Sequence, residues 1–151
     1  MLRDRFANDL KAAILAKDAC ATSTLRLILA ALKDRDIAAR TKGQRNGIGE
    51  DEIVAMLQTM IKQRRESIDL YERGGRLELA QQEADEIALI ERFLPAQLSD
   101  KEIDAAVRSV VADLGGGSLK DMGRIMAELR SRYAGRMDFS KASALVKQQL
   151  S

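Results

Sequence analysis

The chain has 151 residues, of which 46% are hydrophobic and 32% charged, and this favours one ordinary domain or two small ones over general disorder. The formal net charge of +2 is too small to indicate nucleic-acid binding. The absence of histidine and the single cysteine, Cys20, exclude Ser-His-Asp and Cys-His catalysis, zinc sites of Cys and His ligands, and an intramolecular disulfide. Aromatic residues make up only 3% and helix formers are abundant, so the composition predicts an all-α fold.

Helical periodicity predicts four helices before position 95, at about residues 2–18, 22–39, 50–73 and 77–93. The segment Thr41–Gly49 contains three glycines and no apolar period, which is typical of a flexible loop. Gly74 and Gly75 are expected to end the third helix, because glycine readily adopts the left-handed conformation at a helix end. The fourth helix then returns beside the third with Leu77 facing inward, so the two form a long antiparallel hairpin.

The single proline, Pro95, predicts a boundary between an N-terminal helical domain, residues 1–94, and a C-terminal domain, residues 95–151. Ser99 and Glu102 match a capping box at the start of the fifth helix. Glycine-containing breaks after that helix and near position 135 divide the remaining chain into two more helices. The C-terminal domain is therefore predicted to be a small three-helix unit.

Gly115–Gly117, followed by Ser118 and Lys120, superficially resembles a phosphate-binding loop. Such a loop needs a preceding buried strand and a Gly-Lys-Ser/Thr ending, so the pattern instead favours a connector whose Ser118 caps the next helix. In that helix Leu119 is expected to face the core. Gly123 is expected to mark a close approach of another helix, since glycine inside a helix costs about 1 kcal/mol relative to alanine. The sequence predicts no nucleotide site, no cofactor, no metal site and no catalytic residue.

Cations are concentrated at the C-terminal end of the chain. Residues 118–151 hold seven basic and three acidic side chains, whereas residues 1–94 hold 16 of each. The tail residues that could together present cations to one anionic ligand are Lys120, Arg124, Arg132, Arg136 and Lys141. An ordinary solvated helical surface has the same pattern, so both interpretations stay open.

The string KQRRES, residues 62–67, places Lys62 and Arg65 close together on the long third helix, where they could bind a phosphate or a carboxylate. The alternative is an exposed series of ion pairs, because acidic residues follow four positions later and fill the returning helix between 78 and 91. Arg64 falls on the inward side of the helix and is expected in a buried or interdomain ion pair.

Five strings stand in the order seen in GatB/YqeY proteins: KQRRES (62–67), Gly74-Gly75-Arg76, FLPAQLS (93–99), MGRIM (122–126) and GRMDF (135–139). The chain resembles the stand-alone YqeY-like members over nearly its whole length. The resemblance implies a helical N-terminal domain and a three-helix domain similar to the C-terminal tail of the B subunit of glutamine-dependent aminoacyl-tRNA amidotransferase. In that enzyme the tail helps hold the tRNA body, and a separate cradle domain carries ATP, metal and amidation chemistry. By this resemblance Lys120, Arg124 and Lys141 would match the basic surface of the tail.

Three functional hypotheses follow. The leading one is a non-catalytic, tRNA-associated helical module that contacts phosphates without reading bases. The second is a protein-interaction adaptor whose long hairpin presents an exposed apolar groove. The third is an accessory component of a carbon–nitrogen ligase with glutamine as amido donor, the label that the family often carries. The candidate partners are therefore tRNA or another structured RNA, amidotransferase subunits, or another protein.

The distribution of apolar residues predicts the compartment. The longest apolar run, Leu27–Leu32, is too short to cross a membrane, and the first ten residues carry charges where a signal peptide needs an apolar segment. These features predict a soluble cytoplasmic protein.

Overall fold

The computed structural model describes residues 1–150, and this part of the chain is helical with no strand, which confirms the all-α prediction. The chain divides into two compact units at the single proline. Unit 1 is Met1–Leu94, and unit 2 begins at Pro95. Each unit has a hydrophobic core of its own.

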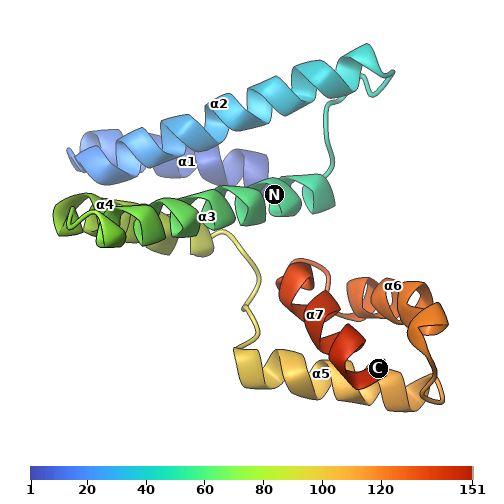
Figure 1. Ribbon diagram of the computed structural model, residues 1–151. Coiled ribbons are helices and arrows are strands. Elements are labelled where there is room, and N and C mark those ends of the chain that lie inside the picture. Colours follow the sequence, from blue (N-terminus) through green and yellow to red (C-terminus); the bar gives the residue numbers. More distant parts are fainter. Residues whose placement is uncertain (151) are drawn as a thin grey trace. The chain divides into compact units, whose positions relative to one another are not determined.

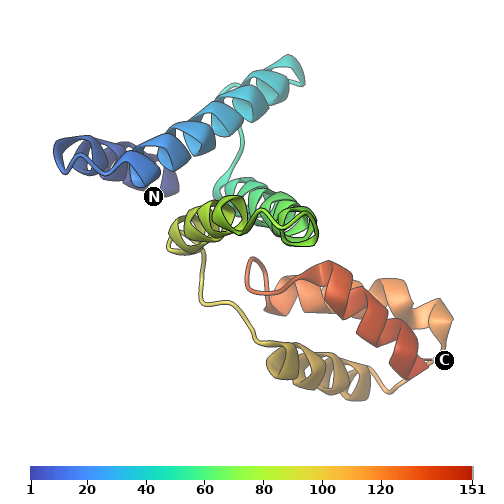
Figure 2. The ribbon, with the colours of Figure 1, turned by 60° about the vertical axis from the view of Figure 1, so that its left-hand side comes forward.

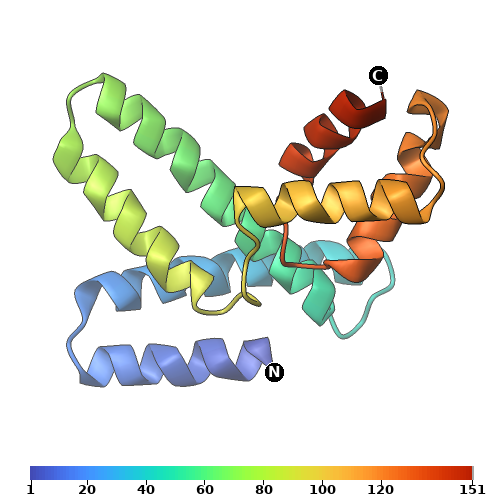
Figure 3. The ribbon, with the colours of Figure 1, turned by 90° about the horizontal axis from the view of Figure 1, so that it is seen from below.

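Unit 1 consists of α1 (Leu2–Leu15), α2 (Ala19–Thr41), α3 (Glu50–Arg73) and α4 (Leu77–Glu91). Helix α1 packs on α2, and α3 packs on α4, while α2 also contacts both α3 and α4 (Figure 1). Figure 3 shows α3 and α4 running side by side in opposite directions, as do α1 and α2.

Local sequence explains where these helices begin and end. Asp18 begins α2, because its side chain accepts a hydrogen bond from the backbone N–H of Ala21 and so satisfies one of the free donors of the first turn. The first turn of α3 is acidic, which suits the positive end of the helix dipole. Gly75, with φ of 73°, follows the end of α3 in the left-handed conformation that glycine adopts at little cost.

The core of unit 1 is made of the periodic apolar residues of its four helices. The fully buried large side chains are Phe6, Leu25, Ile28, Ile53, Met56, Leu57 and Ile90. Phe6 of α1 meets Phe93, just after α4, edge to face with 4.9 Å between ring centroids, and this contact joins the two ends of the unit. Leu77 is 66% exposed, so its predicted inward position is wrong.

Unit 2 contains α5 (Asp100–Asp113), the 3₁₀ turn η1 (Leu119–Asp121), α6 (Met122–Arg132) and α7 (Phe139–Leu150) (Figure 2). Helix α7 contacts both α5 and α6, which also contact each other. Ser99 and Glu102 form the predicted capping box, with each side chain bound to the other's backbone N–H. Each unit therefore has at least one helix that begins at a short polar cap, Asp18 in unit 1 and Ser99 in unit 2.

Two expectations for α6 differ from the structure. Ser118 caps the 3₁₀ turn, whereas α6 itself begins at Met122, so Leu119 lies in the turn and is 55% exposed. A Cβ added at Gly123 would meet nothing within 4 Å, so this glycine does not mark a close helix approach. The core of unit 2 is formed instead by residues such as Val107, Val110, Ile125, Leu129 and Met137.

Candidate nucleic-acid interface

Two strings of the family resemblance, 40 residues apart, meet in unit 2. The Leu98 N–H donates to the carbonyl of Arg136 at 2.8 Å, and Gln97 Nε2 donates to the carbonyl of Gly135 at 2.6 Å. Arg136 Nε in turn donates to the carbonyl of Ala96 at 3.1 Å. These bonds fix the turn before α7 against the segment before α5. The guanidinium of Arg136 donates to a neutral carbonyl and forms no ion pair within 4 Å among residues 1–150, although its charge contributes to the lowered pKa of the Glu102 carboxyl group.

Three other tail candidates are in ion pairs. Arg132 contacts Asp113 and Glu128, each at 2.8 Å, and these two carboxylates raise the pKa of the guanidinium. The remaining pairs are Arg124 with Asp121 at 3.5 Å and Lys141 with Asp100 at 3.1 Å. All three cations are at least one-third exposed, so solvent weakens these pairs and a phosphate could replace the carboxylate.

Lys120 is exposed in the 3₁₀ turn η1, and its ammonium has no ion pair among the described residues 1–150. Its backbone N–H donates to Ser118 Oγ, which fixes the turn that carries it. Nearby, the guanidinium of Arg130 lies 5.8 Å from the centre of the Phe139 ring, a cation–π contact that leaves its charge in place. Unit 2 thus holds Lys120, Arg130 and Arg136 without a carboxylate partner in that part of the chain.

The candidates in unit 1 are more fully matched by acids. Arg65 on α3 pairs with Glu91 on α4 at 3.3 Å, as expected from the acidic returning helix. Arg64 lies 2.9 Å from Glu86 and 4.0 Å from Glu83, with its side chain only 12% exposed, which confirms the expected buried ion pair. Burial, followed by repulsion from Glu86, raises the pKa of Glu83. Lys62 is exposed on the same helix, where no carboxylate of residues 1–150 lies within 4 Å of it.

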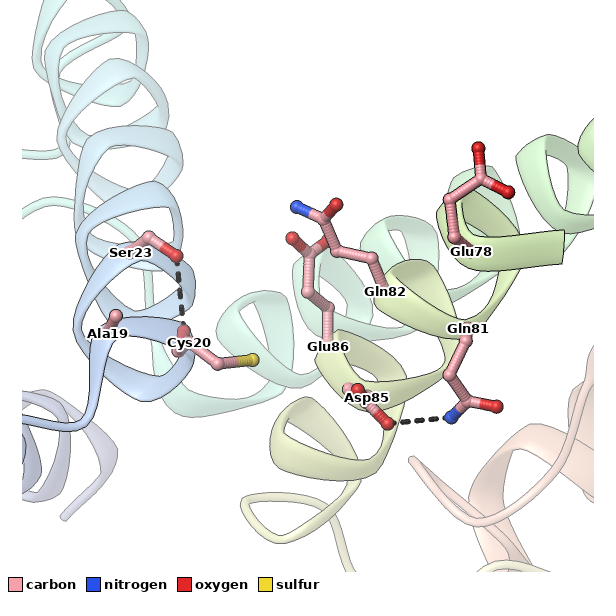
Figure 4. A pocket seen from close by; sticks show the side chains of 8 residues that line it. All are labelled: Ala19, Cys20, Ser23, Glu78, Gln81, Gln82, Asp85 and Glu86. Atoms are coloured by element: carbon pink, nitrogen blue, oxygen red, sulfur yellow. Dashed lines mark hydrogen bonds between the residues drawn. The ribbon is translucent and has the colours of Figure 1, made fainter. Parts of the chain in front are cut away.

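Most residues that line the pocket between α2 and α4 are polar or charged, whereas the adaptor hypothesis expects an apolar groove on the hairpin. Figure 4 shows Cys20 and Ser23 of α2 on one side and Gln82, Asp85 and Glu86 of α4 on the other. A mainly apolar groove of about 360 Å³ lies instead in unit 2, between α5 and α7. Its lining includes Ile103, Ala144 and Leu145.

The loop Thr41–Gly49 is anchored by a charged pair that sequence reasoning missed. Asp36 is buried on α2 and accepts from Arg3 at 2.6 and 2.8 Å and from the backbone N–H of Ile48 at 2.9 Å. The Arg3 hydrogen bonds, with the Ile48 N–H, lower the pKa of Asp36 from 3.8 to about 2. A Cβ at Gly47, where φ is 79°, would collide with Asp36 Oδ1. The signal in the sequence was an aspartate on the buried face of a helix.

Within residues 1–150, no group of three His, Cys, Asp or Glu side chains is placed to hold a metal ion. None of the helices in that range has the length and apolar character needed to span a membrane.

The fold and these contacts define a two-unit, all-helical protein in which residues 96–98 and 135–136, from two strings of the family resemblance, meet in unit 2. The sequence model of the family described as Yqey-like protein matches residues 3–150. The chain belongs to this family, and it is related in general to the tail of the amidotransferase B subunit.

Curated relatives include "Altered inheritance of mitochondria protein 41, mitochondrial" from Kluyveromyces lactis, which is 32% identical over 108 residues, or 70% of this chain and 56% of the relative. The protein of the same name from Vanderwaltozyma polyspora is 35% identical over 109 residues, with the same two shares. The chain spans about half the length of the curated relatives it matches.

The predicted cytoplasmic location is wrong by this comparison, since these relatives are named as mitochondrial proteins. The prediction rested on the lack of an apolar leader. Mitochondrial leaders are amphipathic and rich in arginine rather than apolar, so that argument could not distinguish the compartments.

Proposed function

We propose that this protein is a non-catalytic helical module that associates with structured RNA, with tRNA as the first candidate. The observation that carries the proposal is Arg136, a cation that two family strings orient through hydrogen bonds to backbone carbonyls and that forms no ion pair within 4 Å among residues 1–150. A guanidinium held in this way retains its Nη donors for a phosphate, which it can bind in a bidentate manner.

The other tail cations extend this surface. Lys120 is unpaired in the described residues, while Arg124, Arg132 and Lys141 sit in exposed pairs that a phosphate can enter. Contacts of this kind position an RNA by its backbone and shape and do not read its bases. The low aromatic content gives few surfaces for stacking unpaired bases, which favours folded over single-stranded RNA.

The test is binding of unfractionated tRNA by the full chain at several salt concentrations. The variants are Lys120→Gln, Arg136→Gln and Arg136→Lys, each alone, and the double variant Lys120→Gln/Arg136→Gln. We expect Arg136→Gln with Lys120→Gln to weaken binding on the order of 10-fold and to reduce the slope of log affinity against log salt by about 1.5. Arg136→Lys retains the charge and is expected to preserve more of the affinity.

Arg108→Gln is the matched control, because Arg108 is an exposed arginine of unit 2 in an ordinary ion pair with Asp104 at 3.1 Å. Binding that is equal in the control and in the double variant would place any RNA contact outside these residues. A wild-type chain that binds no tRNA at low salt would refute the proposed function.

The α5–α7 groove supports a protein-interaction adaptor as the second candidate function. Its apolar lining is bordered by Asp100, Asp104 and Lys141, so it offers both an apolar floor and charged edges to a partner segment. Affinity capture with and without ribonuclease separates the two functions. A partner protein that is still captured after ribonuclease treatment, but is not captured by Leu145→Lys, favours the adaptor. If that partner is an amidotransferase subunit, the result favours the accessory role in a carbon–nitrogen ligase.

A further inference from the structure

The outer side of α2 carries three cations in register. Arg26, Lys33 and Arg40 are exposed and follow one another at seven-residue intervals. Seven residues are about two helical turns, so the three side chains lie on one side of the helix, spaced by roughly 10 Å and spanning about 21 Å. By helical spacing the buried residues of α2, among them Leu25, Ile28 and Leu32, lie roughly 100° further around the helix axis, so the three cations run along one edge of the exposed side of α2.

These cations are not neutralised within the described part of the chain. No carboxylate of residues 1–150 forms an ion pair with Arg26, Lys33 or Arg40. Arg40 acts on Asp36 only at longer range, because that carboxylate already accepts from Arg3. The flank of this side of α2 carries one exposed acid, Asp34, against three cations.

A hollow extends the cationic surface beyond the first of these residues. It measures about 400 Å³ between the end of α1 and the start of α2, and its lining includes Lys17, Thr22, Ser23 and Arg26. Asp18 also lines it, although its carboxylate caps α2 through the Ala21 N–H. The hollow therefore joins a second cation and two hydroxyl groups to the row that Arg26 begins.

Lys17 holds an unusual backbone conformation, with φ of 57°, in the left-handed region that costs a lysine more than a glycine. A glycine would close the turn between α1 and α2 with less strain. Lys17 and Arg26 both line the hollow. Lys17, Arg26, Lys33 and Arg40 together are called the α2 cationic face.

We propose that the α2 cationic face binds the phosphate backbone of a nucleic-acid duplex, which is the helical part of a structured RNA if the proposed function holds. A duplex presents one negative charge for about every 1.7 Å of its axis, so a straight row of cations some 21 Å long faces many phosphates at once. The α2 cationic face lies in unit 1, whereas the proposed function rests on Arg136 of unit 2. This inference rests on the proposed function only in taking RNA as the nucleic acid.

Charge and side-chain type favour this ligand over a membrane. Membrane-surface helices insert a continuous apolar face, but the apolar face of α2 is part of the core of unit 1. The large apolar side chains exposed on α2 are Leu27 and Ile37, each about half exposed. They are too few and too far apart to form such a face.

The test measures binding of the full chain to a short RNA duplex, a DNA duplex of the same sequence, and vesicles rich in phosphatidylserine. The variant is Arg26→Gln/Lys33→Gln/Arg40→Gln. Its matched control is Arg73→Gln/Arg76→Gln/Arg108→Gln, which removes three exposed arginines that are in ion pairs. We expect the affinity of the α2 variant for the RNA duplex to fall on the order of 10-fold, and the slope of log affinity against log salt to decrease by about two to three. The affinity of the control is expected to change by about twofold or less.

Lys17→Gly separates binding from folding. It removes a cation from the hollow and relieves the left-handed lysine, so we expect weaker duplex binding with an unchanged or higher melting temperature. Weaker binding accompanied by a lower melting temperature in this variant would mean that Lys17 serves the turn and would remove the hollow from the proposal.

The outcomes distinguish this inference from the proposed function. If the α2 variant binds RNA like wild type while Lys120→Gln/Arg136→Gln does not, the inference is wrong and the proposed function stands. If only the α2 variant loses binding, the inference stands and the tail is not the contact. If wild type binds vesicles but neither duplex, or binds none of the three, the inference fails. Equal binding to the RNA duplex and the DNA duplex supports the inference and identifies the phosphate backbone, which both share, as the group that is bound.

Discussion

The two units use their charges in opposite ways. The tail of unit 2 has the larger excess of basic residues in the sequence, yet Arg124, Arg132 and Lys141 are all in ion pairs. Unit 1 has as many acids as bases, and one side of α2 still presents Arg26 and Arg40 without an ion pair among residues 1–150.

The reason is the location of the acids. In unit 1 some of them are used inside the fold, where Asp36 binds Arg3 and Glu86 of α4 binds Arg64. In unit 2 the acids lie on the surface beside the cations. The net charge of a segment therefore does not determine its surface potential, because a carboxylate satisfied in the interior leaves distant cations unmatched.

Replacement of Asp36 with alanine is expected to have the largest effect on stability among the changes that test this difference. Asp36→Ala leaves Arg3 and the Ile48 N–H without their partner, so we expect the free energy of unfolding to fall by about 3 kcal/mol. Urea denaturation measures it. Asp34→Ala is the control on the same helix, and since Asp34 is exposed its effect should stay within about 0.5 kcal/mol. Equal effects at the two positions would show that Asp36 is not used structurally.

Acid titration sharpens the same point. The pKa of Asp36 is about 2 in the folded chain and 3.8 without its partners, so the folded state binds this proton less readily than the unfolded state. The stabilisation by the charged carboxylate is therefore complete above about pH 4 and is lost as the pH falls from there toward 2. Denaturant midpoints measured over this range should fall more for wild type than for Asp36→Asn, and parallel curves would contradict the assignment.

A smaller effect is expected at Gly123, in the charged surface of unit 2. A Cβ there has open space around it, so Gly123→Ala should raise the free energy of unfolding by about 0.5–1 kcal/mol. Thermal denaturation checks the gain, and RNA affinity should not change because no charge is altered. A loss of stability would show that another helix approaches this position after all.

The smallest effect is expected at Arg132. Its two carboxylate partners are exposed, so Arg132→Gln should change the free energy of unfolding by about 0.5 kcal/mol or less, in contrast with Asp36→Ala. Added salt should reduce even this difference. A loss as large as that of Asp36→Ala would mean that the surface pairs of unit 2 are as structural as the buried pair of unit 1.

Much of the fold followed from local patterns. The all-helical character, the limits of α3 and the capping box of Ser99 and Glu102 depend on residues within a few turns of one another, and the structure agrees with the sequence at each. The errors at Leu77 and Leu119 have a different origin. Both stand at the start of a helix or turn, where apolar spacing continues but no neighbouring helix remains to cover the side chain.

The candidate site was only partly accessible from the sequence. Clustering of basic residues indicated the tail, and the acidic segment before position 91 correctly indicated a partner for Arg65. The row of Arg26, Lys33 and Arg40 was not predicted, because residues 1–94 as a whole hold 16 basic and 16 acidic side chains and so show no excess of charge. Sequence spacing shows which side of a helix a residue occupies, but not which carboxylate reaches it.

The amino-acid order alone predicted the all-helical character, the limits of α3 and the family, because each depends on short-range periodicity or on strings read in order. Only the tertiary structure decided which charges cancel. An ion pair forms when two oppositely charged side chains approach within about 4 Å. Packing brings Arg3 and Asp36 into such a pair and places the Arg136 guanidinium on the carbonyl of Ala96, and neither contact is indicated by the separation of the residues along the chain.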